Sequence, residues 1–492
     1  MATSAFPSTS LGLPASLDYK LAPSLSPDSK AYWVSVSPDS LQSVTTPVAV
    51  PLGTLAIGTS PNNPFNSQIL AFTIPTGDSP SVFMDCRETT LNFKLTVQVT
   101  TATNAAMISH SLVSSAQSFF DSLTLYSNNV PIEQIGSYGV LASQLLAATL
   151  NSAERYGGGA VSLGGDTNTF QGIDLPLGNA LGTWYFNFSI PLISVIGINN
   201  QQHLFPVGMI NNLQLQMQTA TTLPFVSYNT TALTNGGAML VTISDVSLNM
   251  KYINIGADST RLLLSTLNGG KVFMKTQTWV QSSANIPINS AGTQNILYQI
   301  RNSSVKSLLI QNTMPNAGAS VGITPNGQYD AINPSLTQFN VSIGGVYHPQ
   351  RPLSPTMRPA ECFLHFMSAL GMSGDWKRYG GCITRSGYGA TAAAVAGSDS
   401  SIVVPANGLR AESSFNATNQ VVAQFPCQAY LGIDFEKSSG VLFSGVNTRA
   451  SPPVGNYYIQ TPVPNTVTSF AFALVDCVLV VDGASSTIQA FV

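Results

Sequence analysis

Charged side chains are scarce in this chain. Asp, Glu, Lys and Arg make up 8% of its 492 residues, against about a quarter in an average soluble protein. A chain that binds nucleic acid through its phosphates needs clustered Lys and Arg, so a net charge of −3 without a basic cluster predicts no specific nucleic acid binding. A disordered chain is excluded as well, because 44% of the residues are hydrophobic.

Long hydrophobic runs are also missing, and cysteine is rare. No stretch reaches the about 18 consecutive apolar residues of a membrane-spanning helix, so we expect no membrane span. Residues 1–20 lack the basic segment and apolar run of a secretory signal. The five cysteines are odd in number and scattered, as expected of free thiols in a reducing compartment: Cys86, Cys362, Cys382, Cys427 and Cys477. These features predict a protein that is synthesised inside the cell and not secreted.

Titratable residues that could form a catalytic or metal site are few. The four histidines lie far apart in the sequence. Cys362 and His365 are three residues apart on an expected helix, and Cys382 could add a third ligand. A zinc site needs about four ligands, so we predict no metal site.

Three short segments match ligand-binding motifs only in part. Residues 269–271 (Gly-Gly-Lys) lack the first glycine and the closing Ser or Thr of a phosphate-binding loop, and a turn that opens a strand is the better interpretation. Residues 166–168 begin like a calcium loop, but the later oxygen ligand and glycine are absent. Residues 156–159 (YGGG) follow an expected helix rather than a strand, which does not suit a nucleotide site. We therefore predict no cofactor.

Two clusters of polar residues are further candidates for a catalytic or binding site. Asp434 and Glu436 alternate onto one face of an expected strand, as a glycosidase dyad would, but rim residues of a solvated or interfacial strand fit them better. Residues 376–379 (Trp-Lys-Arg-Tyr) could stack on a base or anchor a protein contact, and the low overall charge favours the protein contact. No residue is assigned a catalytic role, so we expect that the chain is not an enzyme.

What the chain does have is a long internal repeat. Residues 119–150 and 336–371 each read as an alternating strand, a two-residue turn, a return strand that begins with Val, and an amphipathic helix. Two later pairs of strands recur in the same order: Trp184–Leu192 with Ala429–Glu436, and Leu240–Tyr252 with Phe472–Asp482. A period this long indicates two copies of a whole domain.

The secondary structure expected within each copy is mainly β. Leu91, Phe93 and Leu95 alternate with polar residues, which is the period of a half-buried strand. The first helix is expected behind Ser137 as cap, with its apolar stripe at Tyr138, Leu141, Leu145, Leu146 and Thr149. The second helix is expected from Pro359 to a stop at Gly371, with its stripe at Phe363, Phe366, Met367 and Leu370. The sequence therefore predicts an all-β protein of two tandem sandwiches, each with a short helix between its middle strands.

The domain boundaries follow from composition and from these elements. They are an extended or partly ordered N-terminal arm at 1–65, a first sandwich at 66–255, a connector at 256–270 and a second sandwich at 271–492.

This layout resembles the double jelly-roll major capsid proteins of small double-stranded DNA viruses, of the Polinton-like virus and virophage type. Residues 111–150 carry the resemblance: a strand that contains DSLTLYSNNVPIEQ leads into Tyr138-Gly139 and a helix with Leu145-Leu146. In coarse form the likeness extends over about residues 60–492.

The resemblance implies a fold, a function and a set of partners. Each sandwich would be an eight-stranded jelly roll, and three chains would form a homotrimeric, pseudo-hexameric capsomer. Such capsomers tile an icosahedral virion shell through lateral contacts. A penton vertex protein and minor or cement capsid proteins would be further partners.

Other readings remain open from the sequence alone. The main alternative is a two-domain β-sandwich binding module, such as an adhesin or a lectin. A single-jelly-roll coat protein with a protruding domain would need a basic arm and two unrelated halves. An enzyme on a β-sandwich would need more titratable residues than this chain offers.

Overall fold

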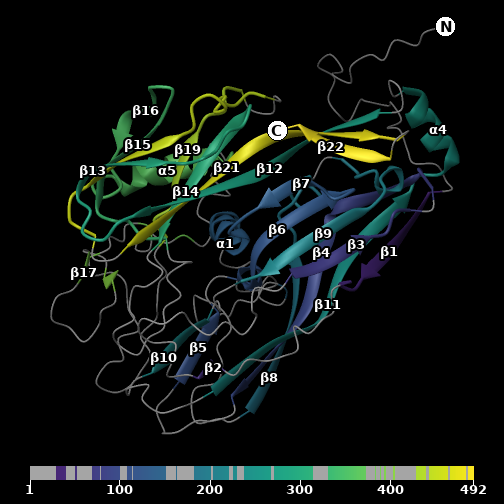
Figure 1. The fold of residues 1–492 in the computed structure, drawn as a ribbon, viewed down its shortest axis with the longest axis horizontal. Coiled ribbons are helices and arrows are strands. Elements are labelled where there is room, and N and C mark those ends of the chain that lie inside the picture. The colour runs from purple at the N-terminus through teal and green to yellow at the C-terminus, as the bar shows by residue number, and fades with distance from the viewer. Residues whose placement is uncertain are drawn as a thin grey trace, which may run out of the picture.

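The structure is a computed structural model, and it describes the following residues: 29–39, 50–51, 69–77, 79–99, 108–112, 115–150, 162, 182–200, 203–220, 225–229, 238–266, 271–313, 331–372, 383, 388, 393–394, 403–404, 428–438, 443–463, 466–483 and 486–491. Four larger sheets, grouped in two pairs, dominate this part of the chain (Figure 1). No helix within it is long and apolar enough to cross a membrane.

The first pair of sheets is built from the first half of the chain. One sheet has the strand order β1-β11-β4-β8 and the other has the order β3-β9-β6-β7, with antiparallel neighbours throughout. The strands are β1 (Lys30–Val36), β3 (Ile69–Ile74), β4 (Val82–Val99), β6 (Phe120–Ser127), β7 (Val130–Ile135), β8 (Gly182–Pro191), β9 (Leu213–Thr219) and β11 (Ala238–Asn254). β1 lies within the segment 1–65 that was expected to form an arm, and it pairs with β11 over its whole length.

The second pair of sheets repeats the first. Its sheets have the orders β12-β21-β14-β19 and β13-β20-β15-β16. The strands are β12 (Lys271–Ile286), β13 (Gly292–Leu297), β14 (Val305–Thr313), β15 (Leu336–Ile343), β16 (Val346–Leu353), β19 (Leu431–Asp434), β20 (Val454–Ile459) and β21 (Val467–Asp482). Each half has eight main strands, which are the eight named for it above. Counted in chain order, strands 1, 8, 3 and 6 form one sheet, and strands 2, 7, 4 and 5 form the other. The predicted repeat of two eight-stranded sandwiches is confirmed.

Shorter elements decorate the two sandwiches. They are β2 (Val50–Pro51), β5 (Ile108–Leu112), β10 (Phe225–Asn229), β17 (Ala393–Ala394), β18 (Val403–Val404), β22 (Thr487–Phe491), the 3-10 turns η2 (Ala116–Phe119) and η3 (Val207–Met209), and the helices α1 (Tyr138–Thr149), α4 (Ala257–Thr266) and α5 (Pro359–Ala369). α4 occupies most of the expected connector, where the sequence predicts no helix.

The two predicted hairpin turns are confirmed by their backbone angles. Asn128 and Asn129 have φ values of 48° and 63°, and Gly344 and Gly345 have values of 58° and 82°. A two-residue hairpin turn of this type needs positive φ at both central positions, which Asn and Gly adopt most readily. In each half the hairpin is followed by a helix, α1 or α5, at the expected place.

The expected stripe of α1 is wrong in part. Tyr138 and Leu141 are buried, but Leu145 and Leu146 are half-buried and Thr149 is exposed. The reason is that α1 is enclosed on most of its sides, so small and polar residues are buried with the apolar ones. Ser137 does precede the helix, yet it has a left-handed φ of 46° and its side chain makes no capping hydrogen bond.

The second helix agrees better with expectation. It starts at Pro359, and Gly371 follows its end with a φ of 71°. Phe366 and Met367 are fully buried, while the two outer members of the stripe are half-buried. α5 packs on the outer face of β14 and β19, so every residue of β14 is buried.

The contact between α5 and β19 depends on the absence of a side chain at Gly432. A Cβ atom added there would lie 2.7 Å from the Cα atom of Phe366 and 3.0 Å from the Cβ atom of Ala369. We expect the substitution Gly432→Ala to lower the free energy of unfolding by about 1–3 kcal/mol, as overpacking does in a dense core. Thermal unfolding measures this. Lys437→Ala, an exposed change just beyond β19, should leave the midpoint unchanged, and an unchanged midpoint in Gly432→Ala would show that α5 is not seated on β19.

Candidate functional site at the junction of the two sandwiches

One face of the long strand β21 serves both hydrophobic cores. Along that face Ala471, Ala473 and Val475 belong to the second core, whereas Cys477, Leu479 and Val481 belong to the first. β12 pairs with β21 over 16 residues, from Lys271↔Asp482 to Ile286↔Val467. β22 extends the ribbon beside β21, and Figure 1 shows these strands passing over β7 of the first sandwich. The two sandwiches are therefore joined by a continuous β ribbon.

A buried carboxylate lies at this junction. Glu133 on β7 is 3% exposed, and three donors surround it. Its Oε1 atom accepts a hydrogen bond from Thr278 Oγ1 on β12 at 2.6 Å, and its Oε2 atom accepts one from the Val195 N–H at 3.0 Å and one from Ser194 Oγ. Desolvation by burial raises the pKa of Glu133 above its ordinary value, although the three hydrogen bonds act in the opposite direction.

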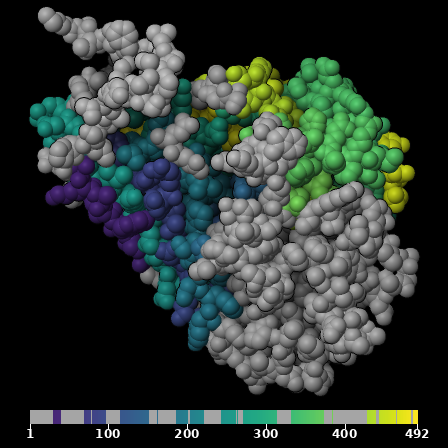
Figure 2. Space-filling view, turned by 180° about the vertical axis from the view of Figure 1, so that it is seen from behind, coloured from purple at the N-terminus to yellow at the C-terminus, as the bar shows by residue number. Residues whose placement is uncertain are grey.

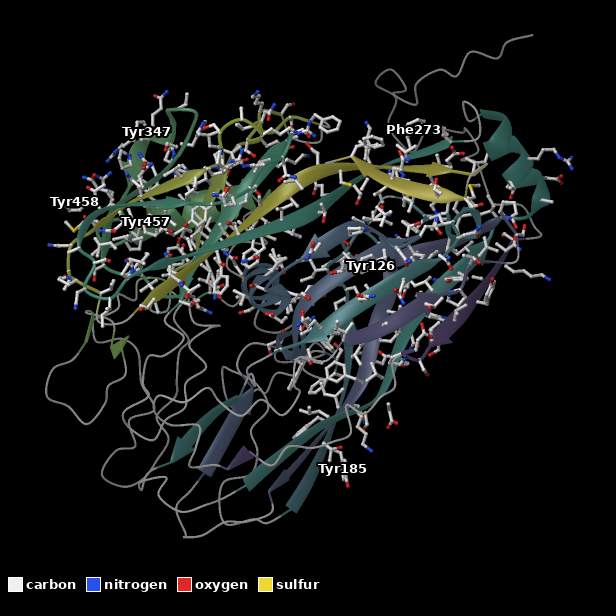
Figure 3. All side chains as sticks on the ribbon, in the orientation of Figure 1. Tyr126, Tyr185, Phe273, Tyr347, Tyr457 and Tyr458 are labelled. Atoms are coloured by element: carbon white, nitrogen blue, oxygen red, sulfur yellow. The ribbon has the colours of Figure 1, made fainter. Side chains whose placement is uncertain are left out.

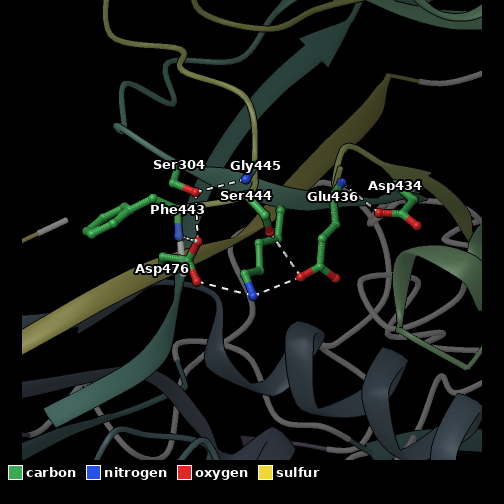
Figure 4. Close-up of polar contacts among 8 residues, drawn as sticks. Ser304, Asp434, Glu436, Phe443, Ser444, Gly445 and Asp476 are labelled. Atoms are coloured by element: carbon green, nitrogen blue, oxygen red, sulfur yellow. Dashed lines mark hydrogen bonds and ion pairs between the residues drawn. The ribbon is translucent and has the colours of Figure 1, made fainter. Parts of the chain in front are cut away.

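A second buried polar network lies in the second sandwich. Lys306 on β14 is 7% exposed, and its Nζ atom lies 3.0 Å from Glu436 Oε1 and 3.3 Å from Asp476 Oδ1 (Figure 4). The Oδ2 atom of Asp476 accepts hydrogen bonds from Ser304 Oγ at 2.7 Å and from the Phe443 N–H at 2.8 Å. This network ties β14, β21 and the segment after β19 together.

A cleft of about 500 Å³ opens beside this network, between the two sandwiches. Its lining comes from both halves and includes Gln117, Asn200, Leu146, Lys275, Trp279 and Asp476. The amide atoms of Gln117 and the Oδ1 atom of Asn200 are buried and have no partner among the described residues. Lys306 and Asp476, which also line the cleft, are paired with each other. The cleft thus offers hydrogen-bonding amides but no nucleophile with an adjacent base.

Several solved structures of viral capsid chains share this architecture. A chain of the PBCV-1 virus capsid is 11% identical and has a TM-score of 0.52, and the match covers 96% of this chain and 98% of that one. The Faustovirus major capsid protein is 9% identical with a TM-score of 0.52, over 96% and 93% of the two chains. A chain of the Sputnik virophage is 10% identical with a TM-score of 0.52, over 100% and 95%.

The fold is a double jelly roll. No protein-family model and no curated protein matches the sequence. The fold expected from the internal repeat and from the family resemblance is therefore confirmed, and the match spans nearly the whole chain rather than one jelly roll.

The acidic pair considered for catalysis lies at the edge of the second jelly roll. Asp434 is exposed, and it accepts hydrogen bonds from the Glu436 N–H at 2.9 Å and from Ser368 Oγ at 3.1 Å. Glu436 is half-buried, and its carboxylate binds Lys306 and accepts a hydrogen bond from Ser444 Oγ (Figure 4). Both carboxylates are thus engaged by neighbouring side chains.

The structure also describes some of the other residues that the sequence offered as candidate site residues. Cys362 is buried, and burial raises the pKa of its thiol to about 12. Within the described part of the chain, no three His, Cys, Asp or Glu side chains are grouped as metal ligands. Lys271 begins β12, as expected for a turn that opens a strand. Cys382 and the segments 156–159, 166–168 and 376–379 lie outside the described residues, as does Cys427, whereas Cys86 and Cys477 are free and buried.

The residues that build the junction were not identified from the sequence. Glu133 is the single acid of β7, Lys306 is the single base of β14, and Asp476 lies between apolar residues in the middle of β21. Such isolated charges were the available signal, because a buried charge needs partners. The sequence alone does not identify the partners of these charged side chains.

The first prediction from this site concerns pH. Because the pKa of Glu133 is raised in the folded state, its contribution to stability is present at low pH and is lost as the pH rises above the ordinary value of 4.5 and through the raised value. We expect Glu133→Gln to remove this loss, so that the difference in thermal midpoint between the variant and wild type changes with pH.

Two further variants test the same site. Glu133→Val should lower the free energy of unfolding at all pH values, because each buried donor left unpaired costs about 1–3 kcal/mol. Glu88→Gln on β4 is the control, since the Glu88 side chain is 47% exposed. Parallel pH profiles for wild type and Glu133→Gln would contradict the assignment.

The second prediction concerns Lys306. Lys306→Met leaves two carboxylates at least partly buried without their cation, and we expect a loss of about 3–5 kcal/mol in the free energy of unfolding. Lys271→Met is the matched control, because the Lys271–Asp482 pair spans 3.8 Å and is partly exposed; it should cost less than about 1 kcal/mol. Chemical denaturation measures both, and equal small losses would show that the network does not hold the second jelly roll together.

Proposed function

We propose that this chain is a major capsid protein, three copies of which form a pseudo-hexameric capsomer of an icosahedral virion shell. The observation that carries the proposal is the pair of jelly rolls with identical strand order, held side by side by one ribbon. Three such chains around a threefold axis present six similar jelly rolls, which is the shape that tiles a flat facet. The matched Faustovirus chain is itself a major capsid protein.

The outward faces of the sheets support this role. On the first jelly roll, Gln214, Gln216 and Gln218 alternate outward along β9. On the second, Asn456 donates a hydrogen bond to Asn340 across β20 and β15 at 3.0 Å. Neutral amide and hydroxyl groups can be buried against a neighbour at less cost than charges. A low charge content therefore suits a protein whose outer faces become interfaces.

The domain division belongs to the same proposal. The first jelly roll is assigned to residues 66–255 and the second to 271–492, with 256–270 as the connector and 1–65 as the arm. The β1 strand of the arm completes the first jelly roll, because it takes the place that β12 takes in the second. α4 gives the connector a helical form.

The partners and the location follow from the proposed role. The chain binds copies of itself, first in the homotrimer and then through lateral capsomer contacts. A penton vertex protein and minor or cement capsid proteins complete the shell. The protein is synthesised inside the host cell and resides in the virion, without secretion, a membrane span or specific nucleic acid binding. Its role is structural, with no catalytic residue and no cofactor.

One observation favours the alternative of a two-domain binding module. The cleft between the jelly rolls carries unpaired amide atoms at Gln117 and Asn200, which could bind a neutral polar ligand. An adhesin or a lectin of this kind does not need three copies to bind its ligand. The two proposals therefore differ in native mass.

Light scattering coupled to size-exclusion chromatography distinguishes the capsomer from the binding module. We expect the purified chain, whose mass is 51.8 kDa, to elute as a species of about three times that mass, with hexagonal outlines in negative stain. A stable monomer that binds a glycan or another neutral ligand in the cleft would contradict the capsomer and support the binding module.

A further inference from the structure

The fifth strands of the two jelly rolls are equivalent but differently covered. β7 and β16 each follow a two-residue turn, and each begins with an exposed valine. Val130 is 61% exposed and Val346 is 54% exposed. Beyond these first residues the two strands diverge, and the difference reflects what lies against each of them.

β7 is covered from within its own chain. Ile132 and Ile135 are buried, and Glu133 accepts the hydrogen bond from Thr278 on β12. β22 also contacts β7. The cover of the fifth strand in the first jelly roll is thus the ribbon of the second jelly roll, in which β12 is the first strand.

β16 has no such cover in the described part of the chain. It pairs with β15 alone, and most of its residues are exposed. Tyr347 is 52% exposed, and Figure 3 shows its side chain at the outer margin of the second jelly roll. Arg351 is the only residue of β16 that carries a permanent charge. This is a partly aromatic surface with a single permanent charge, at the position where β7 is buried.

The element that would cover β16 by analogy is the first strand of a first jelly roll. That strand is β1, which pairs with β11. It exposes two large aromatic side chains, Tyr32 at 43% and Trp33 at 60%, and Lys30 is its only charged residue. Figure 2 shows β1 at the rim of the molecule, open to solvent. A partly aromatic strand left open at a sheet edge is a ready docking surface.

The two surfaces cannot meet within one chain. In Figure 1 β16 lies near one end of the long axis, and β1 lies near the other. A contact between them must therefore join two copies, and it must be heterologous, with different surfaces on the two sides. Heterologous contacts form a closed ring when the rotation between copies divides a full turn.

We propose that β16 and its hairpin, with Tyr347, dock against β1, with Trp33, of a second copy of this chain. The inference rests on the proposed capsomer, which it deepens by naming the contact between its subunits. Within a chain the ribbon of the second jelly roll covers β7; between chains the first jelly roll of the next copy covers β16. Three copies use each surface once and leave neither open.

Cysteine cross-linking between two differently tagged chains tests the contact. One chain carries Trp33→Cys and the other Tyr347→Cys, and the co-expressed pair is treated with a short bis-maleimide. We expect a covalent dimer with both tags only in the mixture, and a covalent trimer when one chain carries both cysteines. The wild-type chain with its native thiols sets the background. Tyr185→Cys with Tyr347→Cys is the control, since Tyr185 is 61% exposed and lies far from both surfaces in Figure 3.

A charge variant supplies the second measurement. Val346→Asp combined with Tyr347→Asp should shift the native mass from three chains to one, while the far-UV circular dichroism spectrum stays that of wild type because both side chains are exposed in the single chain. Tyr185→Asp should keep the mass of three chains.

Each outcome decides the question. Cross-linking of Tyr347→Cys chains with one another would indicate an isologous contact and overturn the inference. A trimer that survives the charge variant and gives no mixed cross-link overturns the inference and leaves the capsomer standing. A monomeric wild-type chain overturns the capsomer and the inference together.

Discussion

The structure depends on one constraint, the use of a single face of the β12–β21 ribbon by two hydrophobic cores. Val475 faces the second core, and Cys477, two residues further along β21, faces the first. Sliding or rotating one jelly roll against the other would expose one of these sets to water. Glu133 and Thr278 add a hydrogen bond across the same junction. The angle between the jelly rolls is therefore fixed by packing, and a fixed angle is what a ring of several jelly rolls requires.

The scarcity of charge follows from the same plan. In the proposed capsomer each sheet would face either a core or a neighbour, which leaves little surface for solvated charges. The charges that do occur inside are bound, as Lys306 is by two carboxylates. Buried ion pairs add little net stability over apolar packing, but removing one partner is costly. Such pairs therefore favour one arrangement of the strands that carry them.

Much of the fold could be predicted because local rules and the global fold agree. The Asn128-Asn129 and Gly344-Gly345 turns identify hairpins through their positive φ values. The alternation at Leu91, Phe93 and Leu95 identifies a strand with one face in the core. The repeat was readable because each jelly roll uses the same order of elements.

The features of the fold that could not be predicted depend on contacts between residues far apart in the sequence. The role of β1 is fixed by its pairing with β11, more than 200 residues later. α1 packs against η2 and β6 of its own jelly roll and is buried on most of its sides, so its stripe could not be read from helical spacing alone. The candidate site shares this origin: Glu133 meets Thr278 only when the two jelly rolls come together, and Lys306 meets Asp476 only when β14 and β21 of the second jelly roll pair. Asp434 and Glu436 looked like a pair in the sequence, yet Glu436 is engaged by Lys306.

Differential scanning calorimetry tests most directly whether the two jelly rolls form one block. Because the cores share β21, the account predicts a single transition whose calorimetric and van't Hoff enthalpies agree for the cooperative unit. Two separable transitions, each with about half of the total enthalpy, would contradict it. The jelly rolls would then be independent domains, and their mutual angle could not be the constraint on which the proposed capsomer depends.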